Sequence, residues 1–232
     1  MPETDKHFRR VLDVAVAAAA LVLLAPLILL IALVILFESG APVIFAQTRL
    51  GQGGRHFQMY KFRKFTTKLT HLGLPLTMQN DARMSRVGRL LANTKLDELP
   101  QFYNILRGDM SVVGPRPESL DFADCFNPST RGLLDYRPGI FGPSQVAFRN
   151  ERDFFPAGSQ PTEVYREVLF PAKAGMDLAY YRDRTLLSDL KWMAFGLLAV
   201  AGVPSRAAAR LVSERQGGQV GVSVPSTQSS RP

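Results

Sequence analysis

Two neighbouring carboxylates, Asp97 and Glu98, are the residues with the clearest capacity for chemistry. They follow a predicted helix and precede Pro100, so we expect the next helix to begin here, with Asp97 in its N-cap region. The dipole of that helix would favour a negative charge by about 0.3–1 kcal/mol and keep the carboxylate ionised. An ionised carboxylate can act as a nucleophile or bind Mg²⁺. The alternative, which spacing alone favours, is an ordinary N-cap followed by a helix-starting glutamate.

A second group of residues carries positive charge, mostly beside rigid loops: Lys61, Arg63, Arg116 and Arg137. Prolines flank Arg116 and follow Arg137, so the backbone there is restricted and each guanidinium loses less entropy when it binds. The planar guanidinium matches the oxygens of a phosphate in pairs. Any single one of these residues is more simply read as solvated surface charge. Taken with the carboxylate pair, the set indicates a phosphorylated substrate.

The counts of cysteine and histidine exclude other chemistries. Cys125 is the single cysteine, which rules out a disulfide within the chain, and the three histidines show no HxxxH spacing. A zinc site built from four cysteines, or from two cysteines and two histidines, is therefore excluded. We read the glycines around residue 53 as a turn, because neither a dinucleotide fingerprint nor a GK[ST] motif is present.

An apolar run from Val14 to Phe37 indicates that the chain is attached to a membrane, which would place the candidate residues near its surface. It is 24 residues long, enough for a straight span at about 1.5 Å per residue. Pro26 lies near its middle, however, and both flanks are basic. Because positive residues prefer the cytoplasmic side, a re-entrant hairpin broken at Pro26 satisfies the charge rule, whereas a span violates it on one side. From these residues alone, hairpin and kinked span remain about equally favoured.

The remainder of the 232-residue chain has the composition of a basic globular domain, with 28 Lys and Arg against 20 Asp and Glu. Much of this charge flanks the apolar run, and no nucleic-acid-binding signature is found, so we expect anionic lipids as partners and no nucleic acid. The predicted elements are strands at 43–45 and 57–62, helices at 83–96, 100–107 and 162–170, and an interfacial or core helix within 192–203. We divide the chain into a hairpin (1–40), a catalytic domain (41–204) and a flexible tail (205–232).

Several stretches in this order and spacing resemble the bacterial sugar transferase family, which comprises monotopic phosphoglycosyl transferases. The resemblance covers about residues 10–191. Its stretches are Gly40 to Phe45 with Gln47 and Arg49, Tyr60 to Arg63, Leu96 to Gln101 with Asn104, Gly108 to Pro117, Arg137 to Ile140 with Gly142 and Gln145, and Asp189 to Lys191.

The resemblance implies a helix-rich α/β domain on the cytoplasmic face of the bacterial inner membrane, with a re-entrant, proline-broken helix and interfacial amphipathic helices. It implies transfer of a sugar 1-phosphate from a UDP-sugar to polyprenyl (undecaprenyl) phosphate, with release of UMP, as the first membrane step of glycan synthesis. Asp97 would be the nucleophile, and Mg²⁺ would lie at Asp97 and Glu98. The substrate-binding residues would be Lys61, Arg63, Arg116, Arg137 and Gln145.

The chain departs from the family pattern in a few places. Ala25 replaces the serine that commonly precedes the proline of the break, and Ala92 replaces an arginine five residues before Asp97. Lys95 replaces a frequent serine, and Lys64 stands where a small residue is common. A rival reading is a non-catalytic basic adaptor that binds anionic lipid. The sequence leaves open the sugar and whether the chain forms a homo-oligomer.

Overall fold

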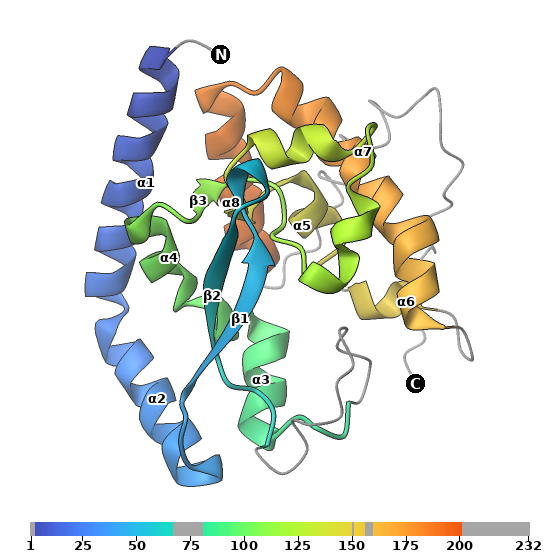
Figure 1. The fold of residues 1–232 in the computed structure, drawn as a ribbon. Coiled ribbons are helices and arrows are strands. Elements are labelled where there is room, and N and C mark those ends of the chain that lie inside the picture. The colour runs from blue at the N-terminus through green and yellow to red at the C-terminus, as the bar shows by residue number, and fades with distance from the viewer. Residues whose placement is uncertain (1–2, 67–80, 150, 156–159, 201–232) are drawn as a thin grey trace, which may run out of the picture.

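The computed structural model describes residues 3–66, 81–149, 151–155 and 160–200. The tail predicted at 205–232 lies outside these residues. Helices dominate the described part, and two small sheets complete it, so the helix-rich α/β prediction is confirmed (Figure 1).

The apolar run forms two helices, α1 (Glu3–Leu23) and α2 (Ala25–Ser39), which meet at a bend of 61°. The break falls at Leu24, and Pro26 lies in the first turn of α2. Proline is tolerated in a first turn, whereas inside a continuous helix its ring would clash with the carbonyl four residues earlier. Within the described residues, no single helix meets the length and hydropathy expected of a span, and the bent pair meets them only when its two helices are taken together.

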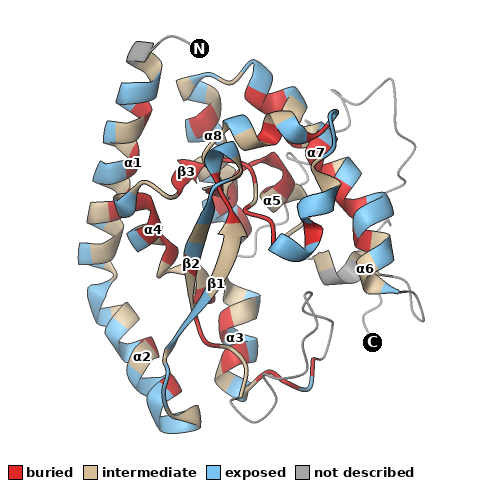
Figure 2. Cartoon of the chain, viewed as in Figure 1, coloured by how far each residue is buried: buried red, intermediate tan, exposed pale blue. Residues whose placement is uncertain are grey.

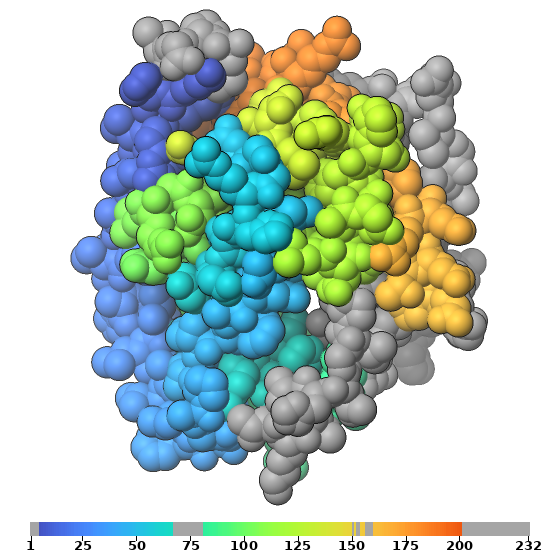
Figure 3. Space-filling view, viewed as in Figure 1, coloured from blue at the N-terminus to red at the C-terminus, as the bar shows by residue number. Residues whose placement is uncertain are grey.

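One face of α2 packs on the domain and the other is uncovered. Ile31 and Ile35 are buried against Phe62 and Leu91. The opposite face exposes apolar side chains, among them Leu29, Leu30, Leu33, Val34 and Phe37, the last of which is 85% exposed. Figure 2 shows this exposed face, and Figure 3 shows both helices along one edge of the molecule. An exposed apolar face of this kind is typical of a surface that contacts a membrane or another protein.

The first helix is joined to the domain by buried polar contacts. The Asp13 carboxylate accepts hydrogen bonds from the backbone N–H of Val112 at 2.8 Å and from the Ser111 hydroxyl at 3.0 Å. Arg10 donates to the carbonyl oxygens of Ile105 and Leu106. The hairpin predicted at 1–40 therefore packs along the domain, because its polar residues find their partners there.

The longer sheet is a hairpin of β1 (Ile44–Leu50) and β2 (His56–Phe62), which pair antiparallel. Both predicted strands are confirmed, and the first is longer than expected. The turn between them uses Gly53 and Gly54, both with positive φ. The second sheet pairs β3 (Ser111–Val113) parallel with β4 (Gly139–Phe141).

The remaining helices surround these sheets: α3 (Arg86–Thr94), α4 (Gln101–Arg107), α5 (Pro143–Ala147), α6 (Pro161–Val164), α7 (Phe170–Arg182) and α8 (Leu186–Val200). Helix α3 begins three residues later than predicted, because Ser85 caps it by accepting the Gly88 N–H at 2.8 Å. Gly108 ends α4 at φ 91°, as predicted. The main core gathers large side chains, including Met110, Phe122, Tyr165 and Tyr181.

Candidate active site

The carboxylate pair lies in a single 3₁₀ turn, Leu96–Glu98, between α3 and α4. Lys95 enters this turn in the left-handed conformation, at φ 62° and ψ 13°. The prediction that Asp97 occupies the N-cap region of the next helix is wrong. Helix α4 begins at Gln101 and Pro100 holds its N-cap position, with no side-chain cap. The extra turn moves Asp97 away from the helix end, so burial and then the neighbouring charges, and not the helix dipole, set its pKa.

Asp97 is a buried carboxyl group with an unused acceptor. Its side chain is 3% exposed, and its Oδ1 atom is buried without a hydrogen bond to any described residue. Burial raises the pKa of Asp97, and the attraction of Lys61 opposes that rise only in part. A raised pKa makes the ionised oxygen more basic and therefore a stronger nucleophile.

Glu98 differs from its neighbour because its charge is paired. The Nζ atom of Lys61 donates to Glu98 Oε1 at 2.8 Å. Burial alone would raise the pKa of Glu98, but the attraction of Lys61, Lys95 and Arg116 outweighs it and lowers the pKa. The environment thus moves the two pKa values in opposite directions, an arrangement typical of carboxyl groups with different roles.

Lys61 lies beside Asp97 and Glu98 because its strand, β2, is hydrogen-bonded to α4. The Asn104 side chain is fully buried; it accepts from the Tyr60 N–H at 3.0 Å and donates to the Gln58 carbonyl at 2.7 Å. Asn104 therefore holds the strand that carries Lys61 against the helix that follows the carboxylates.

Arg116 approaches from a loop that is locked by close backbone packing. A Cβ atom at Gly114 would lie 2.1 Å from the Arg137 carbonyl oxygen, so a larger residue does not fit. The Gln145 amide donates to the carbonyls of Gly114 and Gly139 at 2.8 and 3.2 Å. Burial lowers the pKa of Arg116, but the attraction of Glu151, Glu118 and Glu98 outweighs it and raises the pKa. No described residue forms a hydrogen bond or ion pair with its guanidinium, which leaves the fork available to a ligand.

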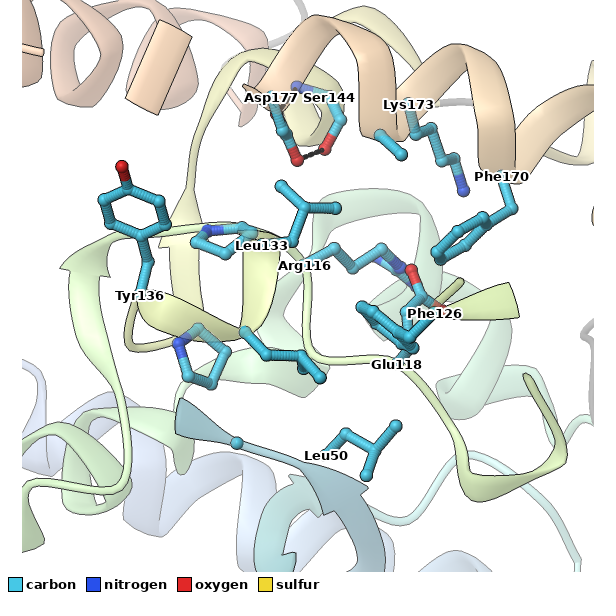
Figure 4. A pocket seen from close by; sticks show the side chains of 15 residues that line it. Leu50, Arg116, Glu118, Phe126, Leu133, Tyr136, Ser144, Phe170, Lys173 and Asp177 are labelled. Atoms are coloured by element: carbon cyan, nitrogen blue, oxygen red, sulfur yellow. Dashed lines mark hydrogen bonds between the residues drawn. The ribbon is translucent and has the colours of Figure 1, made fainter. Parts of the chain in front are cut away.

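A cavity of about 20 Å³ is lined by Arg116, and neither Asp97 nor Glu98 lines it. Arg116 and Glu118 lie on one wall, and Lys173, Asp177 and Ser144 face them from α7 and α5 (Figure 4). This volume accommodates about one water molecule, so the cavity does not hold a nucleotide in this conformation.

Two of the predicted site residues, Arg63 and Gln145, make structural contacts. The Arg63 guanidinium donates to the carbonyls of Ser39 and Gly40 and so clamps the end of α2. Gln145 bridges two loops, as described above. Arg137 lies two residues before β4, and it is not among the main charges that shift the pKa of Asp97 or Glu98. Their assignment as substrate-binding residues remains a prediction.

Two lysines that the sequence analysis did not assign to the site lie beside the carboxylates. Lys64 and Lys95 both interact electrostatically with Asp97 and Glu98, and neither ammonium group forms a hydrogen bond or ion pair with a described residue; the Lys64 Nζ lies 5.5 Å from the centre of the Phe65 ring. Burial lowers the pKa of Lys64 to about 8 and also lowers that of Lys95. The signal that could have identified them is their position, since each departs from the family pattern next to a matching motif.

Asp97 and Glu98 are suited to Mg²⁺ only with help from a ligand. Among the described residues, no three carboxylate, histidine or cysteine side chains gather as a metal site. The unpartnered Oδ1 of Asp97 is nevertheless an oxygen ligand of the type Mg²⁺ prefers. Mg²⁺ is commonly held by one or two carboxylates together with substrate phosphates and water, so the pair fits that pattern.

The chain is similar in sequence to a known protein family and to several characterised relatives. The family model described as bacterial sugar transferase matches residues 4–202. The chain is 39% identical over 186 residues to the UDP-glucose:undecaprenyl-phosphate glucose-1-phosphate transferase of Caulobacter vibrioides, covering 79% of this chain and 66% of the relative. It is 44% identical over 194 residues to the exopolysaccharide production protein PSS of Rhizobium leguminosarum bv. phaseoli, covering 81% and 92%.

A third relative is the UDP-N-acetylgalactosamine-undecaprenyl-phosphate N-acetylgalactosaminephosphotransferase of Aeromonas hydrophila. It is 42% identical over 141 residues, which cover 60% of this chain and 33% of the relative. The chain thus spans about a third of the Aeromonas protein and just under two thirds of the Caulobacter protein.

Proposed function

This chain belongs to the bacterial sugar transferase family, and we propose that it transfers a sugar 1-phosphate from a UDP-sugar to undecaprenyl phosphate, initiating polysaccharide synthesis. The names of the Caulobacter and Aeromonas relatives state this donor class and this acceptor. The observation that carries the proposal is the buried, unpartnered Oδ1 of Asp97 among four cationic side chains.

In this reaction Asp97 is the nucleophile and Glu98 is not. An Asp97 oxygen attacks the β-phosphorus of the UDP-sugar, and the bond from that phosphorus to the bridging oxygen breaks, so UMP leaves. The sugar phosphate stays on Asp97 as an acyl phosphate. An oxygen of undecaprenyl phosphate then attacks the same phosphorus, which releases the Asp97 carboxylate and forms the lipid diphosphate sugar. Glu98 is less suited to attack because Lys61 already occupies it.

The surrounding cations offset the repulsion between a carboxylate and two phosphorylated substrates. Lys61 holds Glu98 in place, and the free guanidinium of Arg116 can bind phosphate oxygens in pairs. Asp97 and Glu98 would hold Mg²⁺, which when bound supplies further positive charge to the diphosphate. A covalent intermediate lets one site serve the two substrates in turn.

The exposed face of α2 supports a membrane position for this site. We propose that α1 and α2 form a re-entrant hairpin in the inner membrane, with the domain facing the cytoplasm. Both basic flanks then stay on one side, and the exposed leucines of α2 contact lipid chains. The carboxylates would lie near the depth of the lipid phosphate.

The reaction is tested by incubating the purified full-length chain with undecaprenyl phosphate, Mg²⁺ and each of a panel of UDP-sugars while measuring UMP. We expect UMP release with at least one sugar and none without the lipid beyond a single turnover. A lipid-binding adaptor predicts no UMP with any sugar, and that result would refute the transfer reaction.

The topology is tested by labelling single cysteines at Asp5 and Thr48, in a chain whose Cys125 is replaced by alanine. A hairpin predicts that an impermeant thiol reagent labels both positions from the cytoplasmic side of oriented membrane vesicles. Labelling from opposite sides would show that the segment spans the membrane.

A further inference from the structure

We propose that Glu118 is a positioning residue for Arg116: its carboxylate, held by Tyr165, lies beside Arg116 on the wall of the small cavity and orients the guanidinium toward the diphosphate of the nucleotide sugar. This inference rests on the proposed function, because that diphosphate belongs to the donor of the reaction. Glu118 follows directly after the stretch that ends at Pro117, and the sequence analysis gave it no role.

The fold fixes the Glu118 carboxylate without neutralising it. The side chain is buried, and the buried Tyr165 hydroxyl donates to its Oε2 atom at 2.7 Å. The Tyr165 ring packs on Phe122, with 4.3 Å between the ring centres. Burial, and then the charge of Glu118, raises the pKa of Tyr165 well above its usual value, so the hydroxyl stays protonated and acts as the donor. Because this donor is neutral, the carboxylate keeps its charge.

The cavity brings the free end of this carboxylate to Arg116. Both residues line it, and Figure 4 shows the guanidinium and the carboxylate next to each other. Among the described residues, none donates to the Oε1 atom of Glu118. A polar cavity of about 20 Å³ accommodates one water molecule, and such a water can bridge two polar groups that do not touch. Glu118 can therefore hold the guanidinium of Arg116 through one bridging water.

The other acidic residues near Arg116 are already paired. Glu151 attracts Arg116 more strongly than Glu118 does, but its carboxylate forms an ion pair with Lys173 at 2.7 Å. Asp177 lines the cavity, and its carboxylate accepts two hydrogen bonds from Ser144. Glu118 is the acidic residue on the cavity wall whose second oxygen remains available to Arg116.

Orientation of Arg116 should raise its affinity for a phosphate. The backbone of its loop is locked by the close packing at Gly114, but the long side chain beyond the Cα atom keeps several rotatable bonds. A side chain that is already held in its binding position loses less conformational entropy when the ligand arrives. Glu118 would thus contribute to binding through Arg116, without touching the ligand.

Binding of UDP to the full-length chain in detergent, measured by calorimetry, tests this role. Glu118→Gln removes the charge but keeps the size and an oxygen that can accept from Tyr165. Tyr165→Phe removes the hydroxyl that holds the carboxylate. Each is made in the wild-type chain and in an Arg116→Gln background. Glu163→Gln, at an exposed position on α6, is the matched control.

We expect Glu118→Gln to weaken UDP binding about tenfold and Tyr165→Phe about threefold, because the second variant keeps the charge and loses only its anchor. Glu163→Gln should change the affinity by less than about twofold. In the Arg116→Gln background, Glu118→Gln should have almost no further effect, because its contribution passes through Arg116.

A merely structural role for Glu118 predicts the same loss of affinity in both backgrounds, and that result would overturn the proposal. Unchanged or tighter UDP binding by Glu118→Gln would overturn it too, since the carboxylate would then only offset the charge of Arg116. If Glu118→Gln does not fold, Tyr165→Phe in the two backgrounds makes the same test.

The outcome is separable from that of the transfer reaction. If the wild-type chain shows this binding pattern but releases no UMP with any sugar, the proposed transfer fails and the role of Glu118 stands. If UMP is released but the pattern is absent, only the role of Glu118 fails. A wild-type chain that binds no UDP would refute both.

Discussion

Arg116 interacts electrostatically with members of two buried polar clusters, and these clusters differ in how their charges are paired. The first, here the dyad cluster, comprises Asp97, Glu98, Lys61, Lys64, Lys95 and Arg116. The second, the α7 cluster, comprises Ser144, Asp177, Lys173, Glu151, Glu118 and Tyr165. In the dyad cluster a single ion pair forms, between Lys61 and Glu98, and the other charges lack a hydrogen-bonded partner among the described residues.

In the α7 cluster every member is hydrogen-bonded. Asp177 accepts from the N–H and the hydroxyl of Ser144 at 3.0 and 2.7 Å. Lys173 pairs with Glu151 at 2.7 Å, and the Tyr165 hydroxyl donates to Glu118 at 2.7 Å. Buried polar groups are stable when each has a partner and costly when one does not. The contrast indicates that the α7 cluster holds the fold, whereas the dyad cluster is completed by a ligand.

The largest expected effect is on the dyad side. Asp97→Asn removes the nucleophile, and we expect the rate of UMP release to fall at least about a thousandfold. Thermal stability should stay the same or rise, because a buried carboxylate without a partner is removed. Asp135→Asn, at an exposed position, is the matched control. Turnover at the wild-type rate in Asp97→Asn would refute the covalent mechanism.

The next largest effect concerns the pH dependence of stability. Burial raises the pKa of Asp177 to about 7, above the roughly 3.9 of an unfolded aspartate. The folded state therefore holds a proton that the unfolded state releases. The stabilisation that this proton contributes to the free energy of unfolding falls as pH rises from about 4 to 7 and is constant above pH 7. The total change is about 4 kcal/mol as an order of magnitude.

Asp177→Asn should flatten that slope while keeping the contacts to Ser144. Unfolding free energies at pH 4.5 and 8, measured by urea denaturation in detergent, would show it. The same slope in the variant and the wild type would contradict a proton held at Asp177.

A third effect comes from breaking the ion pair of the α7 cluster. Lys173→Met leaves Glu151 charged and partly buried, so we expect the unfolding free energy to fall by about 3 kcal/mol. This value is at the lower end of the range for broken buried ion pairs, because the Glu151 side chain is 18% exposed. The double variant Lys173→Met/Glu151→Met should recover most of that loss. If the single and double variants were equally unstable, the pair would not explain the effect.

The smallest effect is at the N-terminal cap of α3, the helix that precedes Asp97 and Glu98. Ser85→Ala removes the acceptor for the Gly88 N–H and should lower the unfolding free energy by about 1 kcal/mol. Ser85→Asp keeps an acceptor and should stay near the wild-type value in the same denaturation assay. Equal losses in both variants would mean that the cap is not the cause.

Local sequence signals predicted several elements well. Gly108 ended α4, Pro26 marked the break between α1 and α2, and the glycines near residue 53 joined β1 and β2, as expected. These features depend on φ preferences and lost hydrogen bonds within a few residues, which the sequence states directly.

Local sequence signals predicted the surroundings of the site residues only in part. Arg63 and Gln145 were predicted to bind substrate, which stays a prediction, and the folded chain has Arg63 Nη2 donate to the Ser39 carbonyl and Gln145 donate to the Gly114 carbonyl, 24 and 31 residues away. No local pattern reports such partners, because they are brought together only when the elements pack.

The sequence by itself determined the family, the carboxylate pair and the excess of positive charge. Tertiary structure alone decided which cations meet the pair, that Asp97 is left unpartnered while Glu98 is neutralised, and that Lys64 and Lys95 join them. The physical reason is that residue type sets which charges a chain carries, whereas burial and distance set how strongly those charges act on one another.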